Sequence, residues 1–389
     1  MRWCAVFTFH LPPDLDAAAV ARMVETAYRP LTRLLLRRPA LRGGLAIEAG
    51  TSERLWREGH EDVFIALRTL MERGQLEAID TAAYGAPLPL LPEEESRRQL
   101  ARNAAINRTY YGLAYRPAGV VTRACAASPA LARIAQRDGY RYLLCDRRAL
   151  PADGDGTAHL RSPGGLALIS CDRDLAEAIA DHTAPRVTML RGAFHRAGDA
   201  SACVLPVERL TEDPARLRRL VSAVERIPLR CLTPREHLTS LEHSAIRRIT
   251  CEPDGAPWLL WHDPDDPVHR MQWRFISHAR ALAERDLDAH PRARELLDRA
   301  LCADFLTAAS PASWNRARIE FGAQLLLESV LAAASDEEEQ AEARFYALEI
   351  AERARARERF FEDARSASAP TARAQAARGE APRRGRRAR

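Results

Sequence analysis

The sequence predicts an α/β fold: an incomplete seven-stranded parallel β/α barrel followed by a C-terminal helical domain. In the first 240 residues, short apolar segments alternate with helical patterns, which is typical of a mostly parallel sheet covered by helices. After about residue 240, long helical patterns follow one another without strands. From residue 366 onward the chain is rich in Ala, Arg, Pro, Gly and Ser, which bury too little apolar surface to order it. We therefore predict a barrel over 1–240, a helical domain over 241–365 and a disordered Arg-rich tail over 366–389.

Each predicted element rests on its own local pattern. Short apolar segments predict strands at 3–9, 43–48, 75–80, 118–121, 141–145, 165–171 and 201–207. Helical patterns lie between them at 16–37, 52–72, 93–107, 128–138, 172–182 and 213–226. Further helices are predicted at 267–285, 290–309, 314–334 and 336–363. The last of these begins with the acidic run Asp336-Glu337-Glu338-Glu339, which suits the positive end of a helix dipole.

Composition and cysteine usage indicate a cytoplasmic globular protein. The chain is 47% hydrophobic and 29% charged. No apolar run approaches the ~20 residues of a membrane span, and the N-terminus enters a strand without a signal-peptide pattern. The eight cysteines are scattered without a Cys-x-x-Cys pair, so we expect structural thiols and neither a disulfide scaffold nor a zinc site.

The positive charge of the chain is concentrated in its tail. All basic residues other than His are Arg, and the formal net charge is +5. Residues 366–389 contain seven Arg and one Glu, which leaves residues 1–365 with a net charge of −1. A nucleic-acid-binding body is therefore not implied, whereas weak contact between the tail and a polyanion is one possible role.

Polar side chains follow several predicted strands. In a parallel barrel, the carboxyl ends of the strands form the mouth where active sites lie. His10 ends the first strand, Glu77 and Asp80 end the third, and Asp146 follows the fifth. Asp172 and Asp174 follow the sixth, and Glu208 follows the seventh. We expect these residues to form a polar cleft at the mouth.

Several motifs resemble glycoside hydrolase family 57. His10-Leu11-Pro12 resembles the family's His-Gln-Pro motif, and Gly74-Gln75-Leu76-Glu77 resembles its second motif closely. The segment from Tyr84 to Leu90 resembles the Tyr-His-x-x-x-Pro-Leu that follows, with Gly85 in place of His. Looser similarity extends through Pro257-Trp258 and the segment 300–314, so it spans about residues 3–335. The resemblance implies the fold of an α-amylase or glucanotransferase barrel with a helical domain.

The resemblance also implies two catalytic positions, and both are altered here. The family's nucleophile is a Glu just after its fourth strand, where this chain has Arg123. No carboxylate exists between Glu95 and Asp138, so a small shift of the alignment does not restore the nucleophile. Its acid/base is an Asp after the seventh strand, where Pro206 stands here, with Glu208 two residues later. Glu208 is therefore the candidate catalytic carboxyl group, and the substrate-binding candidates are His10, Glu77, Tyr84, Asp146, Trp258 and Trp261.

Aromatic residues are densest near residue 260. Trp258, Trp261 and Trp273 lie there with His262 and His269 between them. Tryptophan rings stack on sugars and also fill cores, so both a glycan platform and core or interface packing stay open.

Other site classes are poorly supported. A phosphate-binding loop needs a Lys, and we find neither a dinucleotide fingerprint nor a Gly-x-Ser-x-Gly elbow. The Asp pair and His-x-x-x-His of metal-dependent deacetylases are also missing, so no metal or other cofactor is expected.

Three functions fit these observations. The first is a non-hydrolytic protein that binds a glycan or a glycan-processing enzyme. The second is an active α-glucan hydrolase or glucanotransferase that uses relocated carboxylates. The third is a structural or regulatory interaction module whose barrel mouth is blocked by Arg123.

Overall fold

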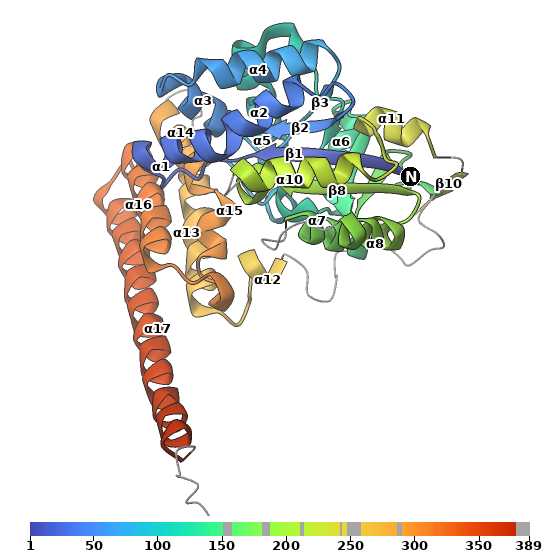
Figure 1. Ribbon diagram of the computed structural model, residues 1–389. Coiled ribbons are helices and arrows are strands. Elements are labelled where there is room, and N and C mark those ends of the chain that lie inside the picture. The colour runs from blue at the N-terminus through green and yellow to red at the C-terminus, as the bar shows by residue number, and fades with distance from the viewer. Residues whose placement is uncertain are drawn as a thin grey trace, which may run out of the picture.

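A nearly closed barrel of seven parallel strands forms the N-terminal part of the chain (Figure 1). The computed structural model describes residues 1–150, 158–180, 187–210, 214–241, 243–246, 258–285 and 290–378. Strand β1 (Arg2–Phe9) pairs in parallel with β2 (Gly43–Ile47) and with β8 (Ala200–Pro206). The circle continues through β3 (Leu76–Ile79), β4 (Gly119–Val120), β5 (Tyr142–Asp146) and β7 (Ala167–Cys171). A single bridge between Asp80 and Val120 joins β3 to β4, and a single pair, Cys171 with Ala202, joins β7 to β8. The predicted fold class is confirmed.

The barrel strands are apolar on both faces because each is covered from inside and outside. Strand β1 buries Cys4 and Val6 on one face and Trp3, Ala5 and Phe9 on the other. Such near-continuous apolar runs are typical of parallel sheets covered by helices. Three short strands outside the barrel were not predicted from the sequence: β6 (Ala158–Arg161), β9 (Arg230–Cys231) and β10 (His243–Ile246).

Helices surround the barrel. The predicted helix 16–37 is continuous but contains a π-helical turn (Val24–Tyr28) between α1 (Ala17–Met23) and α2 (Arg29–Leu36). The predicted helix 52–72 is divided, because Gly59 adopts a left-handed φ of 77° between two helices. The remaining helices of this part are α3 (Ala49–Arg57), α4 (Glu61–Glu72), α5 (Glu93–Tyr111), α6 (Pro129–Arg137), α7 (Arg173–Ala180), α8 (Val187–Ala197), α9 (Val207–Leu210), α10 (Pro214–Glu225) and α11 (Pro234–Thr239).

The C-terminal part is helical, as predicted. Its helices are α12 (Trp258–Trp261), α13 (Pro267–Ala283), α14 (Pro291–Ala300), α15 (Ala303–Thr307), α16 (Arg316–Ala333) and α17 (Glu337–Arg378). The predicted single helix 290–309 is two helices, with Leu301 and Cys302 between them. Helix α17 extends away from the body of the protein (Figure 1).

The tail differs from the prediction over part of its length. Disorder was expected from residue 366, whereas α17 continues to Arg378. Ala and Arg have high intrinsic helix propensity, so a segment that buries little can still be helical, which the composition argument ignored. Residues 379–389 lie outside the described part of the chain.

The barrel and the helical part share one hydrophobic core. A single cluster contains Leu131 and Leu143 from the barrel together with Phe275, Leu297 and Leu326 from the C-terminal helices. A second cluster lies between β1, β2 and the helices on the other side of the barrel. Of the predicted thiols, seven are free, and Cys251 lies outside the described residues. Among the described helices, none is long and apolar enough to cross a membrane.

Candidate functional site

A cavity of about 340 Å³ opens at the carboxyl ends of the barrel strands. Its wall takes one polar residue from the end of each of six strands: His10 after β1, Glu48 after β2, Arg123 after β4, Asp146 in β5, Asp172 after β7 and Glu208 after β8. Residues of α12 and α15 close it from the helical part. Of the residues expected at the mouth, His10, Asp146, Asp172 and Glu208 line this cavity, whereas Glu77, Asp80 and Asp174 do not.

His10 lies between two carboxylates. It follows the last residue of β1, and its backbone carbonyl accepts a hydrogen bond from the Tyr28 hydroxyl at 2.8 Å. Its Nδ1 is 2.6 Å from Oε2 of Glu48, and its Nε2 is 2.7 Å from Oδ2 of Asp304. Burial and the charge of Arg123 lower the pKa of His10, but the two carboxylates outweigh them and hold it well above its usual value. The ring is therefore a buried imidazolium.

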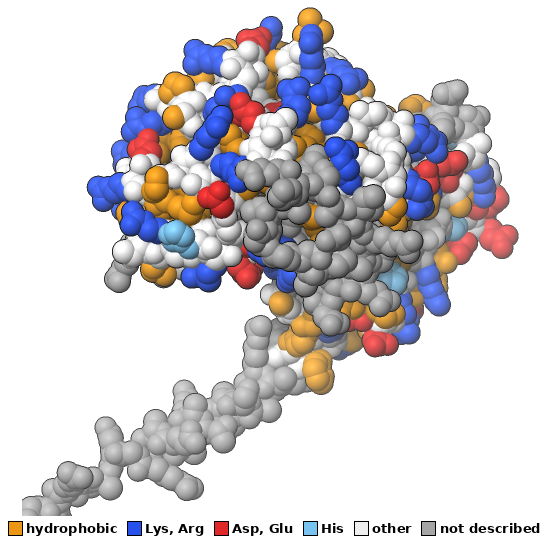
Figure 2. Space-filling model, turned by 90° about the vertical axis from the view of Figure 1, so that its right-hand side faces the viewer, with side chains coloured by type: hydrophobic (Ala, Val, Ile, Leu, Met, Phe, Trp, Pro, Cys, Tyr) orange, Lys and Arg blue, Asp and Glu red, His pale blue; other side chains and the backbone are white. Residues whose placement is uncertain are grey.

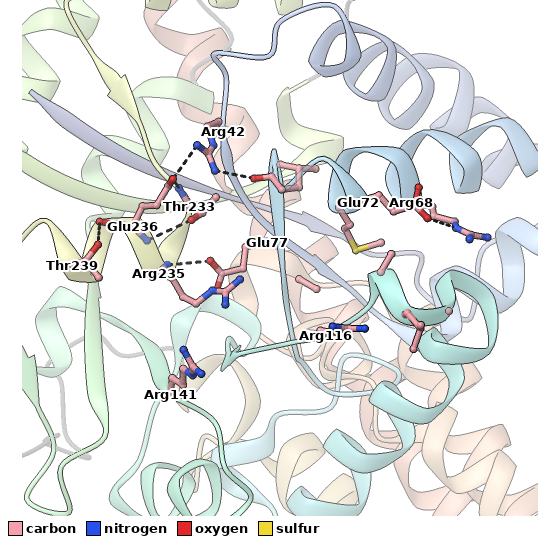
Figure 3. A pocket seen from close by; sticks show the side chains of 17 residues that line it. Arg42, Arg68, Glu72, Glu77, Arg116, Arg141, Thr233, Arg235, Glu236 and Thr239 are labelled. Carbon is pink, nitrogen blue, oxygen red and sulfur yellow. Dashed lines mark hydrogen bonds and ion pairs between the residues drawn. The ribbon is translucent and has the colours of Figure 1, made fainter.

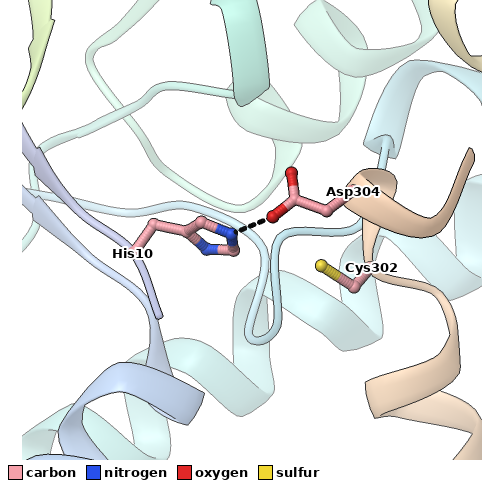
Figure 4. A group of neighbouring side chains, drawn as sticks. All are labelled: His10, Cys302 and Asp304. Atoms are coloured by element: carbon pink, nitrogen blue, oxygen red, sulfur yellow. Dashed lines mark hydrogen bonds and ion pairs between the residues drawn. The ribbon is translucent and has the colours of Figure 1, made fainter. Parts of the chain in front are cut away.

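Asp304 connects the helical part to the barrel. It lies in the first turn of α15, where it faces the His10 ring (Figure 4). Its other oxygen forms an ion pair with the Arg123 guanidinium. Burial would raise the pKa of Asp304, but Arg123 and His10 lower it far below its usual value. Asp304 is thus an anion with two cationic partners.

Arg123 is directed into the cavity by a tight turn. The segment Arg123–Cys125 is a single 3₁₀ turn directly after β4, and Ala124 and Cys125 have φ values of 51° and 54°. Left-handed backbone is unusual for residues with a Cβ and marks a constrained loop. The Thr122 hydroxyl donates to the carbonyl of Ala126 across this turn.

Glu208 differs from the other carboxylates of the cavity. Its Oε2 is buried and has no hydrogen-bond partner among the described residues. Burial raises the pKa of Glu208, and the charges of His10 and Arg123 oppose this only in part. Each other carboxylate of the lining faces a basic group: Glu48 and Asp304 as above, Asp146 with Arg148 at 2.6 Å, Asp172 with Arg147 at 3.4 Å and Glu177 with Arg173 at 2.8 Å.

One group of side chains has the composition of a metal site. His10, Cys302 and Asp304 have ligand atoms within 4.8 Å of one another (Figure 4). The imidazolium of His10 has no free lone pair, and a metal ion would compete with the Arg123 guanidinium for Asp304. These residues fit an internal ion-pair network better than a metal centre.

The predicted aromatic residues occupy different positions. Trp261 lines the cavity, and its Nε1 donates to Oγ1 of Thr307 at 3.0 Å. It also belongs to the shared hydrophobic core, which agrees with the packing role; its role as a glycan platform stays a prediction. Trp258 begins α12, is half-buried and is not part of the cavity wall. Trp273 donates from Nε1 to the backbone carbonyl of Trp261 at 2.7 Å.

Tyr84 and Glu77 lie away from the cavity. The Tyr84 ring is buried against Gly50, and its hydroxyl donates to Glu53 at 3.0 Å. Glu77 is the second residue of β3 and accepts from the Tyr142 hydroxyl at 2.8 Å, at the opposite end of the barrel. The sequence argument placed both Glu77 and Asp80 at the end of this strand, but only Asp80 follows it.

Asp80 is a buried carboxylate that stabilises the fold through hydrogen bonds. It is fully buried, and it accepts hydrogen bonds from the Asn103 side chain at 2.7 Å and from the Thr81 backbone at 3.0 Å. Burial raises the pKa of Asp80 to about 6. Its contacts fix the junction of β3 with helix α5.

From the sequence we did not identify two of the charged residues that contact one another at the mouth, namely Glu48 and Asp304, which join His10 and Arg123 there. Glu48 ends the predicted strand 43–48, so the rule that selected the other residues would also have found it. Asp304 comes from a helix almost three hundred positions after His10, and only the folded structure brings them together.

Comparisons with known proteins agree with this architecture. A model of glycosyl hydrolase family 57 matches residues 10–181. A 4-α-glucanotransferase from Thermococcus litoralis has a TM-score of 0.65 and 15% identity, over 84% of this chain and 57% of that one. This chain therefore spans little more than half of the glucanotransferase.

Two further structures match over nearly their whole length. For a family 57-type branching enzyme from Pyrococcus horikoshii the TM-score is 0.62 at 14% identity, over 89% of this chain and 94% of the other. An α-amylase from Thermotoga maritima has a TM-score of 0.59 and 13% identity, over 91% and 99%. No curated protein sequence is significantly similar to this chain. The resemblance predicted from the sequence is confirmed: residues 10–181 match the model of glycosyl hydrolase family 57, and the solved structures share the fold of this chain.

Proposed function

We propose that this protein binds a glycan in the cavity at the barrel mouth and does not hydrolyse it. The observation that carries the proposal is the side chain after β4. At this position the Arg123 guanidinium lines the cavity and forms an ion pair with Asp304, and no carboxylate takes its place. Retaining hydrolysis needs two carboxyl groups about 5–5.5 Å apart, and an oxocarbenium-like centre is disfavoured beside a cation.

The remaining charges support the same proposal. Every carboxylate of the cavity wall except Glu208 faces a basic partner, so little negative charge is free to stabilise a cationic transition state. The cavity nevertheless has the properties of a small-molecule site: a volume of about 340 Å³, polar groups on several sides and one tryptophan in its wall. Binding without turnover uses these features and needs no nucleophile.

An α-glucan is the first ligand to test. The solved structures with this fold include a 4-α-glucanotransferase and an α-amylase. A bound glycan could in turn bring the protein to a glycan-processing enzyme, which would make it a regulatory partner. We place it in the cytoplasm, in keeping with its seven free thiols.

Calorimetric titration with maltoheptaose, combined with an assay for new reducing ends, tests the proposal. Saturable binding without product is expected, and Trp261→Phe should weaken binding. Trp56→Phe is the matched control, because Trp56 is exposed on α3 outside the cavity. Sustained turnover would overturn the proposal, as would equal effects of the two tryptophan variants.

A hydrolase that uses Glu208 as its acid is the second candidate. The buried Oε2 without a partner and the raised pKa of Glu208 favour the protonated form of this carboxyl group, which is the form a general acid needs. Inverting hydrolysis uses a water in place of a nucleophile, so the missing Glu does not forbid it. Turnover that disappears in Glu208→Gln would favour this function over the first.

A further inference from the structure

A second and larger pocket lies at the opposite end of the barrel. Its volume is about 1080 Å³, and its wall shares no residue with the cavity at the mouth. Arg42 directly precedes β2, whereas Glu48 directly follows it, so the two sites are about 20 Å apart along that strand. Arg116 and Arg141 precede β4 and β5 in the same way. The pocket is therefore built at the amino ends of the strands.

Five arginines and three glutamates line this pocket (Figure 3). Each glutamate is paired with one arginine: Arg42 with Glu236 at 2.9 Å, Arg68 with Glu72 at 2.8 Å and Arg235 with Glu77 at 3.2 Å. This leaves two positive charges in the lining without a counterion. The surface seen from the side where β1 begins also carries many arginines (Figure 2).

Arg116 and Arg141 carry those two charges. Both are exposed, and neither guanidinium has a partner among the described residues; no dashed line reaches them in Figure 3. A guanidinium presents a planar set of donors that matches phosphate and binds it in a bidentate manner. Two unpaired guanidiniums on one pocket favour an anion with more than one charged oxygen.

Part of the pocket wall is apolar. Met71, Leu76 and Ala78 form a buried portion of it, and Leu113 is 81% exposed at its edge. A volume above that of many small-molecule sites leaves room for more than a phosphate group. An organic group attached to the phosphate would cover Leu113 and exclude water from it, since Met71, Leu76 and Ala78 are already buried.

We propose that this pocket binds a small organic phosphate, with Arg116 and Arg141 holding the phosphate groups and Leu113 contacting the organic part. The glycan cavity lies at the other end of the barrel, so this proposal is independent of glycan binding. A ligand here would contact the loops before β4 and β5, whose carboxyl ends carry Arg123 and Asp146 into the cavity.

Calorimetric titrations of the full chain with adenosine diphosphate and with inorganic pyrophosphate test the proposal. Adenosine diphosphate should saturate one site and bind more tightly than pyrophosphate, with an affinity that falls as salt rises. The double variant Arg116→Gln/Arg141→Gln should lose at least about tenfold in affinity. Glu77→Gln should bind several-fold more tightly, because it removes a negative charge and frees Arg235.

The matched control is Arg133→Gln/Arg191→Gln. These two arginines are exposed on α6 and α8, and they line neither pocket. The control should bind adenosine diphosphate as the unmodified chain does. Absence of saturable binding overturns the proposal, as does an equal loss in the control. Equal affinities for pyrophosphate and adenosine diphosphate would contradict the claim that the pocket also binds the organic part of the ligand.

Discussion

At the scale of single residues, the chemistry of the cavity depends on His10 and its neighbours. The imidazolium joins Glu48 from β2 to Asp304 from α15, and Asp304 also holds Arg123. Removal of one partner from a buried ion pair leaves an uncompensated charge, which costs more than the pair itself contributes. The polar residues of the cavity could be predicted from the sequence where they follow a strand, as His10 and Glu208 do. Asp304 was not, because its role depends on a contact between distant segments.

His10→Gln should lower the free energy of unfolding by about 3–5 kcal/mol at pH 6, because Glu48 and Asp304 are left buried with one cation fewer. The raised pKa of His10 sets the pH dependence. Its stabilisation is complete below the unfolded pKa of about 6.5 and is lost as the pH rises through the folded pKa. Urea unfolding at several pH values measures this. His195→Gln, at an exposed site on α8, should have little effect; equal losses in both variants would contradict the prediction.

At the scale of elements, helices α5 and α14 are joined by a buried charged network. Glu95 of α5 is ion-paired with Arg98 of the same helix and with Arg294 of α14. Asp298 of α14 forms an ion pair with Arg98 of α5. The Gln99 side chain donates a hydrogen bond to Asp298 at 2.9 Å. The sequence predicted both helices from their apolar periodicity. It did not predict the network, because charges on one helix do not show which helix they will face.

Glu95→Gln should destabilise the protein by about 3–5 kcal/mol at neutral pH, because Arg98 and Arg294 lose a buried carboxylate and only Asp298 is left to pair with both. Burial raises the pKa of Glu95, but Arg98 and Arg294 outweigh it and lower the pKa to about 2. The stabilisation is therefore present above the unfolded pKa of about 4.3 and is lost as the pH falls toward 2. Urea unfolding at neutral and acidic pH is the measurement. Glu94→Gln, exposed on the same helix, is the control, and a difference that grows in acid would oppose the prediction.

At the scale of the whole molecule, the boundary near residue 240 was predicted from a change in pattern. Among the described residues the last strand is β10, at His243–Ile246, and the elements after it are helices. Periodicity shows that each helix has an apolar face, but it does not show that α13, α14 and α16 bury theirs against the barrel. The shared core follows from which faces meet, and the sequence leaves that choice open.

We therefore expect the barrel and the helical part to unfold as one unit. They share the cluster that contains Leu143 and Phe275, and Asp304 supplies the counterion for both His10 and Arg123. A chain of residues 1–240 would expose that apolar surface and leave two buried cations short of an anion, so it should not fold cooperatively. Scanning calorimetry of the full chain should show a single transition, with calorimetric and van't Hoff enthalpies that agree. Two resolved transitions, or a stable fragment 1–240, would mean that the barrel supports its own charged mouth without the helical part.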